Sequence, residues 1–141
     1  MMNESVLIVD EDANAGIITA HLLRLRGFRA RAVADADTAG AHLENENVAV
    51  VLVGIDCPEA SGLDCLRRVR AGLDSIHAGA GANASPTPHV IALTRRQEPE
   101  VERFVRRMGA DLLLRRPVDP PDLIRAVEYF AAHHTPALRR A

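Results

Sequence analysis

The chain of 141 residues contains no lysine and no tryptophan, and it has only one tyrosine, three phenylalanines and two cysteines. With so few rings it offers no aromatic platform on which a nucleic-acid base or a flavin could stack. Cys57 and Cys65 allow one disulfide at most and lack the number and spacing of a zinc site. The net charge of -2 excludes a strongly basic nucleic-acid-binding protein.

The sequence also lacks the features of membrane insertion or export. No apolar run approaches the ~20 residues of a membrane-spanning helix, and the first residues show neither the basic segment nor the apolar stretch of a signal peptide. With 48% hydrophobic and 26% charged residues, the chain is typical of one globular domain. We therefore expect a cytoplasmic protein with reduced thiols and no membrane association.

Five short apolar runs alternate with five helical patterns. The strands are expected at Val6–Val9, Phe28–Val33, Val48–Val53, Val90–Leu93 and Asp111–Leu114. The helices are expected from Asp12 to Gly27, from Asp35 or Asp37 to about Asn45, at Gly62–Ala71, at Pro99–Met108 and from Asp119 to about Ala132. This alternation predicts a parallel sheet with helices on both faces and a functional site at the carboxyl ends of the strands.

Two segments stand outside this rhythm. Residues 72–88 are rich in Gly, Ala, Ser, Asn and Pro, which predicts a flexible surface insertion. Residues 133–141 are expected to form a frayed tail, so the domain covers residues 1–132. In the first helix, Ile17, Ile18 and Leu25 are among the residues whose spacing indicates the helix.

The turn after the first strand is acidic, with Asp10, Glu11 and Asp12 in succession. A dinucleotide-binding protein would have a glycine-rich turn there, and a phosphate-binding loop would have Gly, Lys and Ser or Thr. Three acids repel phosphate unless a cation lies between them, so this turn indicates either a metal site or no site. Asp12 is expected to cap the first helix.

Several short motifs follow one another in a characteristic order. They are Val9-Asp10-Glu11 after the first strand, Pro58 and Gly62 in the loop after the third, Ile91-Ala92-Leu93-Thr94 at the end of the fourth, and Gly109-Ala110-Asp111 and Arg116-Pro117 on either side of the fifth. From about Glu4 to Ala132 this set resembles the receiver domain of bacterial two-component response regulators. The resemblance implies a flavodoxin-like (βα)5 sandwich with strand order 2-1-3-4-5 and a role in phosphorelay signalling rather than catalysis.

The resemblance also implies roles for particular positions. In receivers, a carboxylate at the end of the third strand accepts a phosphoryl group, and acids after the first strand hold Mg²⁺. A hydroxyl after the fourth strand and a lysine after the fifth bind the phosphoryl oxygens, and an aromatic residue in the fifth strand moves with the hydroxyl. The matching residues here are Asp10, Glu11 and Thr94, whereas Gly54 stands at the acceptor position, Arg116 at the lysine and Leu113 at the aromatic residue.

Glycine has no nucleophile, so Gly54 predicts a degenerate, phosphorylation-independent receiver that needs no cofactor. Asp56, two residues further on, is the alternative acceptor, although it is more simply explained as a loop acid. Any Mg²⁺ at Asp10 and Glu11 should bind weakly, and a salt bridge from Arg116 into this acid pair would close the pocket without metal. A small-ligand sensor that uses the vacated pocket is a further alternative.

Residues 95–116 contain seven arginines and four acids. The arginines are Arg95, Arg96, Arg103, Arg106, Arg107, Arg115 and Arg116. The resemblance implies that the fourth helix, fifth strand and fifth helix dock a protein partner, which would be a histidine kinase, an output domain or a second copy of the chain. The alternative is a solvated helix whose charges pair with one another, as Glu102 and Arg106 would at this spacing. We expect no direct nucleic-acid binding and assign no catalytic residue.

Overall fold

The computed structural model describes residues 4–56, 61–80 and 87–134. Its five strands form one parallel sheet in the order β2-β1-β3-β4-β5, as the sequence predicts. The strands are β1 (Ser5–Val9), β2 (Arg29–Val33), β3 (Val48–Gly54), β4 (His89–Thr94) and β5 (Leu112–Arg115). The predicted marker Pro58 and the tail residues 135–141 lie outside the described residues.

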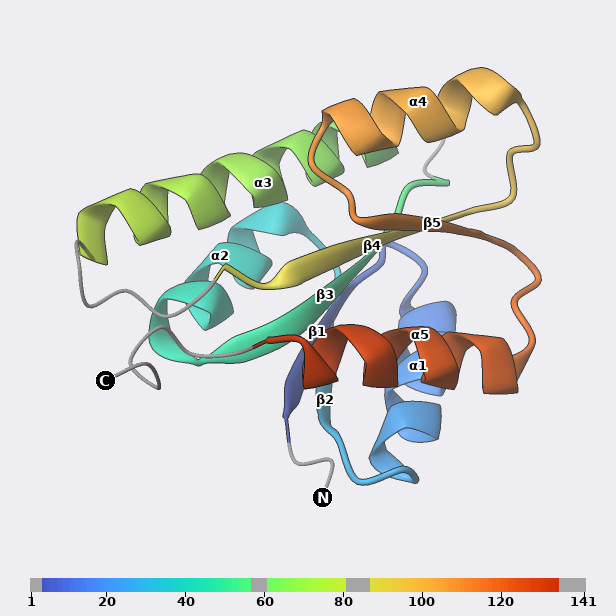
Figure 1. Ribbon diagram of the computed structural model, residues 1–141, viewed down its shortest axis with the longest axis horizontal. Coiled ribbons are helices and arrows are strands. Elements are labelled where there is room, and N and C mark those ends of the chain that lie inside the picture. The colour runs from blue at the N-terminus through green and yellow to red at the C-terminus, as the bar shows by residue number, and fades with distance from the viewer. Residues whose placement is uncertain (1–3, 57–60, 81–86, 135–141) are drawn as a thin grey trace.

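Helices cover both faces of the sheet (Figure 1). They are α1 (Ala13–Arg24), α2 (Ala36–Asn45), α3 (Ser61–Ala80), α4 (Pro99–Arg107) and α5 (Pro120–Ala132). Helices α1 and α5 pack on one face, and α2, α3 and α4 pack on the other. The central strand β3 is buried along its whole length, and its alternate residues contribute to the two cores.

Helix α1 packs on the sheet through Gly16, Ala20 and Leu23 rather than through the apolar residues that indicate it in the sequence. A Cβ at Gly16 would lie 3.3 Å from the Cβ of Ala32 in β2, so the helix approaches the sheet closely at this end. Leu23, three residues after Ala20, is completely buried on the same face. Ile17 and Ile18 are consequently exposed, so the helical spacing locates the helix but does not identify its buried face.

Helix α3 corrects the prediction of a flexible insertion over residues 72–88. The helix continues to Ala80, and residues 81–86 lie outside the described part of the chain. Leu73 is buried and Ile76 packs on the same core, so both extend the helical spacing of the residues before them. Their burial offsets the cost of about 1 kcal/mol for Gly72 inside a helix.

Side chains cap the first two helices. Asp12 accepts hydrogen bonds from the backbone N–H groups of Asn14 and Ala15 at 3.1 and 3.2 Å, which confirms its predicted role. Asp35, rather than Asp37, caps α2 by accepting the Thr38 N–H at 2.7 Å, and this backbone hydrogen bond lowers the pKa of Asp35. Among the helices of the described residues, none combines the length and the apolar composition needed to cross a bilayer.

Leu73→Ala should lower the free energy of unfolding by about 2–5 kcal/mol, because it removes a buried side chain from the core beneath α3. Urea unfolding followed by circular dichroism measures the change. Gly72→Ala is the matched control: its Cβ would meet open space, so we expect stabilisation of about 0.5–1 kcal/mol. Equal stability of wild type and Leu73→Ala would show that this part of α3 does not pack as described.

Candidate functional site

The carboxyl ends of the strands surround a polar pocket of about 270 Å³. The pocket is lined by Asp10, Glu11, Asp12, Gly54, Asp56, Arg95 and Arg116. The fold therefore brings together residues that are more than one hundred positions apart in the sequence. Most of the residues that the sequence singles out lie here, as expected for a doubly wound parallel sheet.

Asp10 follows β1 and is buried, with 7% of its surface exposed. Its Oδ1 accepts the Asp12 N–H at 3.0 Å, and its Oδ2 accepts from Nη2 of Arg116 at 2.6 Å. A buried carboxylate is stable only when a charge or several hydrogen-bond donors compensate it, and here both are present. This is the salt bridge from Arg116 that the sequence offers as an alternative to a metal, but it reaches only Asp10, because Glu11 is exposed and forms no ion pair within the described residues.

The Arg116 guanidinium lies between two carboxylates. Besides Asp10 it reaches Asp56, with 3.4 Å between Nη1 and Oδ2. Its backbone N–H donates to the Thr94 carbonyl at 2.6 Å, which fixes the chain where it leaves β5. A planar guanidinium can serve two acids at once, whereas a lysine ammonium offers only a point charge.

Asp56 is not the solvent-facing loop acid that the sequence favours. Only 14% of its side chain is exposed, and Oδ1 accepts the Thr94 hydroxyl at 2.7 Å. The two carboxylate oxygens also accept the Arg95 N–H at 2.9 and 2.8 Å. Together with Arg116, donors from the ends of β4 and β5 converge on this one carboxylate.

The direction of Asp56 follows from the strand before it. Ile55 extends the pairing of β3 with β4, because its N–H donates to the Leu93 carbonyl at 2.9 Å, and its side chain is buried. Alternate residues of an extended chain point to the same side. Asp56 consequently points in the direction that a side chain at position 54 would take, which is into the pocket.

Thr94 is completely buried at the end of β4. Its hydroxyl donates to Asp56 and accepts the Arg96 N–H at 3.0 Å, so it holds both the pocket carboxylate and the first residues of the connection to α4. The sequence places Thr94 and Arg95 together at the carboxyl end of the fourth strand, and it also counts Arg95 among the arginines of the basic surface. Arg95 lines the pocket, whereas Thr94 is buried behind it and contacts the pocket through Asp56. The position of Arg95 directly after a strand-end threonine was the signal for its backbone contact with Asp56.

Gly54 ends β3 directly beside Asp10. A Cβ built on this glycine would lie 2.9 Å from both Cγ and Oδ2 of Asp10, and 3.1 Å from its Oδ1. Such contacts require one of the two residues to move. The space that a side chain at Gly54 would need is therefore filled by the Asp10 carboxylate.

The side chains at the acidic turn do not fit a tightly bound divalent cation. Mg²⁺ needs several oxygen ligands in near-octahedral geometry, but the third strand supplies only Gly54, and the Arg116 guanidinium already contacts Asp10. Across residues 4–56, 61–80 and 87–134, no three His, Cys, Asp or Glu side chains gather as a metal site would require. The Arg116 guanidinium instead neutralises the carboxylates of Asp10 and Asp56 within the chain.

The other predicted positions lie away from the pocket. Leu113 belongs to β5, and its aliphatic side chain is buried in the core at the position where receivers have an aromatic residue. Of the seven arginines, Arg106 and Arg115 bind Glu102, at 3.2 and 3.8 Å. Since Arg95 and Arg116 belong to the pocket, the basic surface of α4 and its flanking loops is reduced to the exposed Arg96, Arg103 and Arg107.

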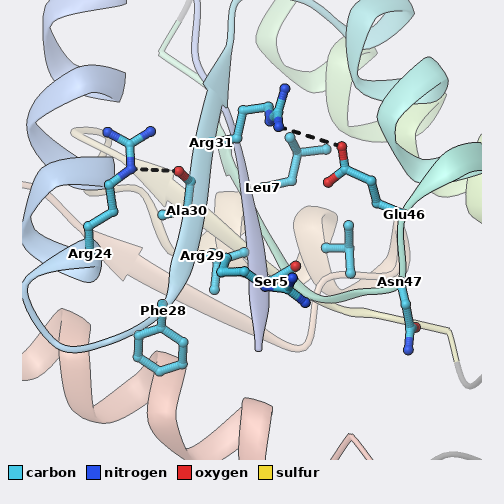
Figure 2. A pocket seen from close by; sticks show the side chains of 11 residues that line it. Ser5, Leu7, Arg24, Phe28, Arg29, Ala30, Arg31, Glu46 and Asn47 are labelled. Atoms are coloured by element: carbon cyan, nitrogen blue, oxygen red, sulfur yellow. Dashed lines mark hydrogen bonds and ion pairs between the residues drawn. The ribbon is translucent and has the colours of Figure 1, made fainter. Parts of the chain in front are cut away.

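A hollow of about 620 Å³ lies at the other end of the strands, near their amino ends (Figure 2). It surrounds the start of β2, which is an edge strand of the sheet. Arg24 and Arg31 lie on opposite sides of this strand. Nε of Arg24 donates to the Ala30 carbonyl at 2.9 Å, and Arg31 lies 3.9 Å from Glu46. These contacts explain the arginines as protection of an edge strand, and none of the predicted site residues lines this hollow.

The comparisons with known proteins agree with this geometry. Residues 6–128 match the family model described as the response regulator receiver domain. The sensory transduction protein RegX3 of Mycolicibacterium smegmatis is 32% identical over 124 residues, which are 87% of this chain and 48% of that protein. The chain thus spans about half the length of the curated relatives it matches.

Solved structures of receiver domains show the same fold. The CheY-like receiver domain protein of Methanospirillum hungatei superposes with a TM-score of 0.74 at 24% identity, and covers 94% of this chain and 96% of that one. The receiver domain of the Francisella response regulator 1452 gives a TM-score of 0.76 at 20% identity, and covers 94% and 100%. At these identities the likeness establishes the architecture only.

Gly54→Ala should destabilise the protein by about 1–3 kcal/mol, because the new methyl group forces the Asp10 carboxylate away from Arg116. Urea unfolding gives the free energy. Gly40→Ala in α2, where a Cβ meets nothing within 4 Å, should instead be neutral or slightly stabilising. If Gly54→Ala unfolded at the wild-type urea concentration, the close packing of Asp10 against Gly54 would be wrong.

Proposed function

The chain belongs to the response regulator receiver domain family, and from this premise we propose that it is a signalling receiver that works without phosphorylation. Receivers act in two-component signal transduction by contacting kinases and output domains. In this proposal the chain keeps that role through protein contacts, and its pocket is neutralised by its own side chains.

The observation that carries the proposal is Gly54 at the end of β3. It occupies the position at which receivers bear the acceptor carboxylate, and it has no atom that could form an acyl phosphate. The Asp10 carboxylate packs where a side chain would extend. The position is therefore both chemically inert and sterically filled.

The contacts of Asp10 support the same conclusion for the cation. Arg116 places a guanidinium nitrogen 2.6 Å from Oδ2, on the carboxylate that Mg²⁺ would need first. A divalent cation would have to displace this charge-assisted hydrogen bond and would find no carboxylate at Gly54. We expect Mg²⁺ to bind weakly if added, and the pocket not to require it.

In this arrangement the carboxylate of Asp56 takes the place of a phosphoryl group as the negative charge of the pocket. Its carboxylate binds the Thr94 hydroxyl, the Arg95 N–H and the Arg116 guanidinium, which lie at the ends of β4 and β5. These contacts link the chain that leaves β3 to the connections that lead into α4 and α5. In our proposal Asp56 thus holds those connections in one arrangement without an external phosphoryl group.

The surface formed by α4, β5 and α5 is the docking face that we propose for a kinase or an output domain. It combines the exposed Arg96, Arg103 and Arg107 with Phe104, which is 39% exposed. An acidic partner with an apolar contact would complement it.

The partly buried carboxylate of Asp56 also favours a second candidate function, a receiver that is phosphorylated at Asp56. For this reaction Asp56 would have to leave its four donor contacts and turn an oxygen towards the phosphodonor. A small-ligand sensor has less support, because the carboxylates of Asp10 and Asp56 that line the pocket already pair with the Arg116 guanidinium.

Incubation with acetyl phosphate or beryllofluoride and Mg²⁺ tests the proposal. We expect no increase in intact mass and no saturable amide shifts at Thr94 or Arg116, because Gly54 has no carboxylate to accept a phosphoryl group and Asp56 is held by its donors. Addition of one phosphoryl group in the wild type but not in Asp56→Asn would instead establish Asp56 as the acceptor. An ordinary phosphorylatable receiver treated in parallel verifies the reagents.

Asp56→Ala should lower the free energy of unfolding by about 1–3 kcal/mol, because Thr94, Arg95 and Arg116 lose their acceptor. Formate should restore part of the loss, since it fits the space of the deleted carboxylate. Thermal unfolding with formate, against chloride at equal ionic strength, measures the rescue.

Asp12→Ala is the matched control for this rescue. Asp12 lines the same pocket, but its side chain only caps α1, so its removal should cost about 1 kcal/mol with no response to formate. An Asp56→Ala protein as stable as the wild type, or one that responds equally to chloride, would contradict the assigned role of Asp56.

A further inference from the structure

The hollow around the start of β2 is lined by charged side chains that are mostly of one sign (Figure 2). Its charged residues are Arg24, Arg29, Arg31 and one acid, Glu46. The lining therefore carries an excess of positive charge, although the chain as a whole has a net charge of -2. A concave surface lined by one sign of charge concentrates ions of the opposite sign, so this hollow favours an anion.

Arg29 has no partner that would explain it as part of the fold. Its side chain is exposed and forms neither an ion pair nor a hydrogen bond with the residues that the structure describes. Arg31 lies 3.9 Å from Glu46, and both side chains of this pair are exposed, so the pair contributes little to stability. Arg29 is thus ready to bind a ligand, and Arg31 can turn towards one at small cost.

Arg29 and Arg31 lie on the same face of β2, because they are two residues apart on an extended strand. Ala30, between them, packs in the core that α1 covers, so the two arginines lie on the opposite face of the sheet. Their register partners in β1 are Ser5 for Arg29 and Leu7 for Arg31. On this face the hollow therefore combines two guanidinium groups with the hydroxyl of Ser5 and an apolar floor.

The outer edge of β2 adds a backbone donor. The Arg29 N–H donates to the Glu4 carbonyl next to β1, and successive residues of a strand direct their backbone groups to alternate sides. The backbone of Ala30 consequently faces the open edge of the sheet, where its carbonyl accepts from Nε of Arg24 at 2.9 Å. The Ala30 N–H points the same way, and arginines lie on both sides of it.

We propose that this hollow binds an anion that carries two or more phosphate groups and lies along the edge of β2. Arginine binds phosphate oxygens through paired N–H groups, and the Ala30 N–H and the Ser5 hydroxyl supply further donors. The three guanidinium groups are spread around one strand, so they match a chain of phosphates better than one small ion. The volume of about 620 Å³ lies in the range of small-molecule sites.

The residues of the hollow recognise phosphate groups rather than a base. Phe28 is the aromatic residue of the lining, and only 3% of its surface is exposed, so it offers no ring for stacking. A linear polyphosphate and the phosphate chain of a nucleotide are two sources of the same chemistry. The site goes beyond the proposed function, because it lies at the amino ends of the strands, away from the pocket of Asp10 and Asp56.

Titration calorimetry of the full chain with sodium tripolyphosphate tests the site. We expect saturable binding that weakens as the NaCl concentration rises, and a loss of affinity of about tenfold or more in Arg29→Gln. Orthophosphate should bind more weakly than tripolyphosphate, because it spans fewer of the guanidinium groups. ATP without Mg²⁺ distinguishes the two sources: affinity equal to that of tripolyphosphate supports recognition of the phosphate chain alone, and a higher affinity supports a nucleotide.

Arg67→Gln is the matched control. It removes the same charge from an exposed arginine of α3 that does not line the hollow, so this variant should bind tripolyphosphate like the wild type. Thermal unfolding without ligand shows whether the variants are folded. We expect the wild-type Tm for Arg29→Gln, because the Arg29 side chain has no partner among the described residues.

Amide NMR shifts locate the bound anion. Tripolyphosphate should shift the amides of Ser5, Ala30 and Asn47 in a saturable way, since these residues line the hollow. Absence of saturable binding would overturn the proposal, as would an equal loss of affinity in Arg29→Gln and Arg67→Gln. Orthophosphate that binds as tightly as tripolyphosphate, or shifts confined to α4, would also overturn it. None of these measurements involves a phosphodonor, so the proposed function stands or falls separately.

Discussion

The contact of the Arg116 guanidinium with Asp10 and Asp56 is the interaction on which the polar end of the fold depends. It brings one positive charge between two carboxylates that come from the ends of β1 and β3. Burial of either carboxylate alone would be costly, because it would lose water without gaining a counter-charge. The Arg95 guanidinium, 3.8 Å from Asp56, adds a second and more exposed positive charge.

Gly54 and this charge arrangement require one another. Asp10 reaches Arg116 by passing over the α-carbon of Gly54, and even a methyl group there would come within 3 Å of the carboxylate. Asp56 points into the same space because it follows Gly54 by two residues on an extended chain. A glycine at this position thus removes the acceptor and also makes room for an internally neutralised pocket.

The surface that carries our proposed function is held partly by contacts within the chain. The surface of α4, β5 and α5 is basic, and several of its charged groups are already held by hydrogen bonds within the chain. A pocket that fixes the connections into α4 and α5 would keep the basic surface in one form.

The sequence by itself determined the order of strands and helices, because buried parallel strands are continuous apolar runs and their helices are bounded by capping residues and glycines. It also determined that Gly54 has no nucleophile, and it offered a contact between Arg116 and the acidic turn as one alternative to a weak metal site. Only the tertiary structure decided which face of α1 is buried, because the helix approaches β2 closely at Gly16 and packs Ala20 and Leu23 against the sheet. It likewise decided how far α3 extends, through the burial of Leu73 beyond Gly72. The direction of Asp56 depended on the pairing of Ile55 with Leu93, a contact between distant segments that residue types and spacing do not record.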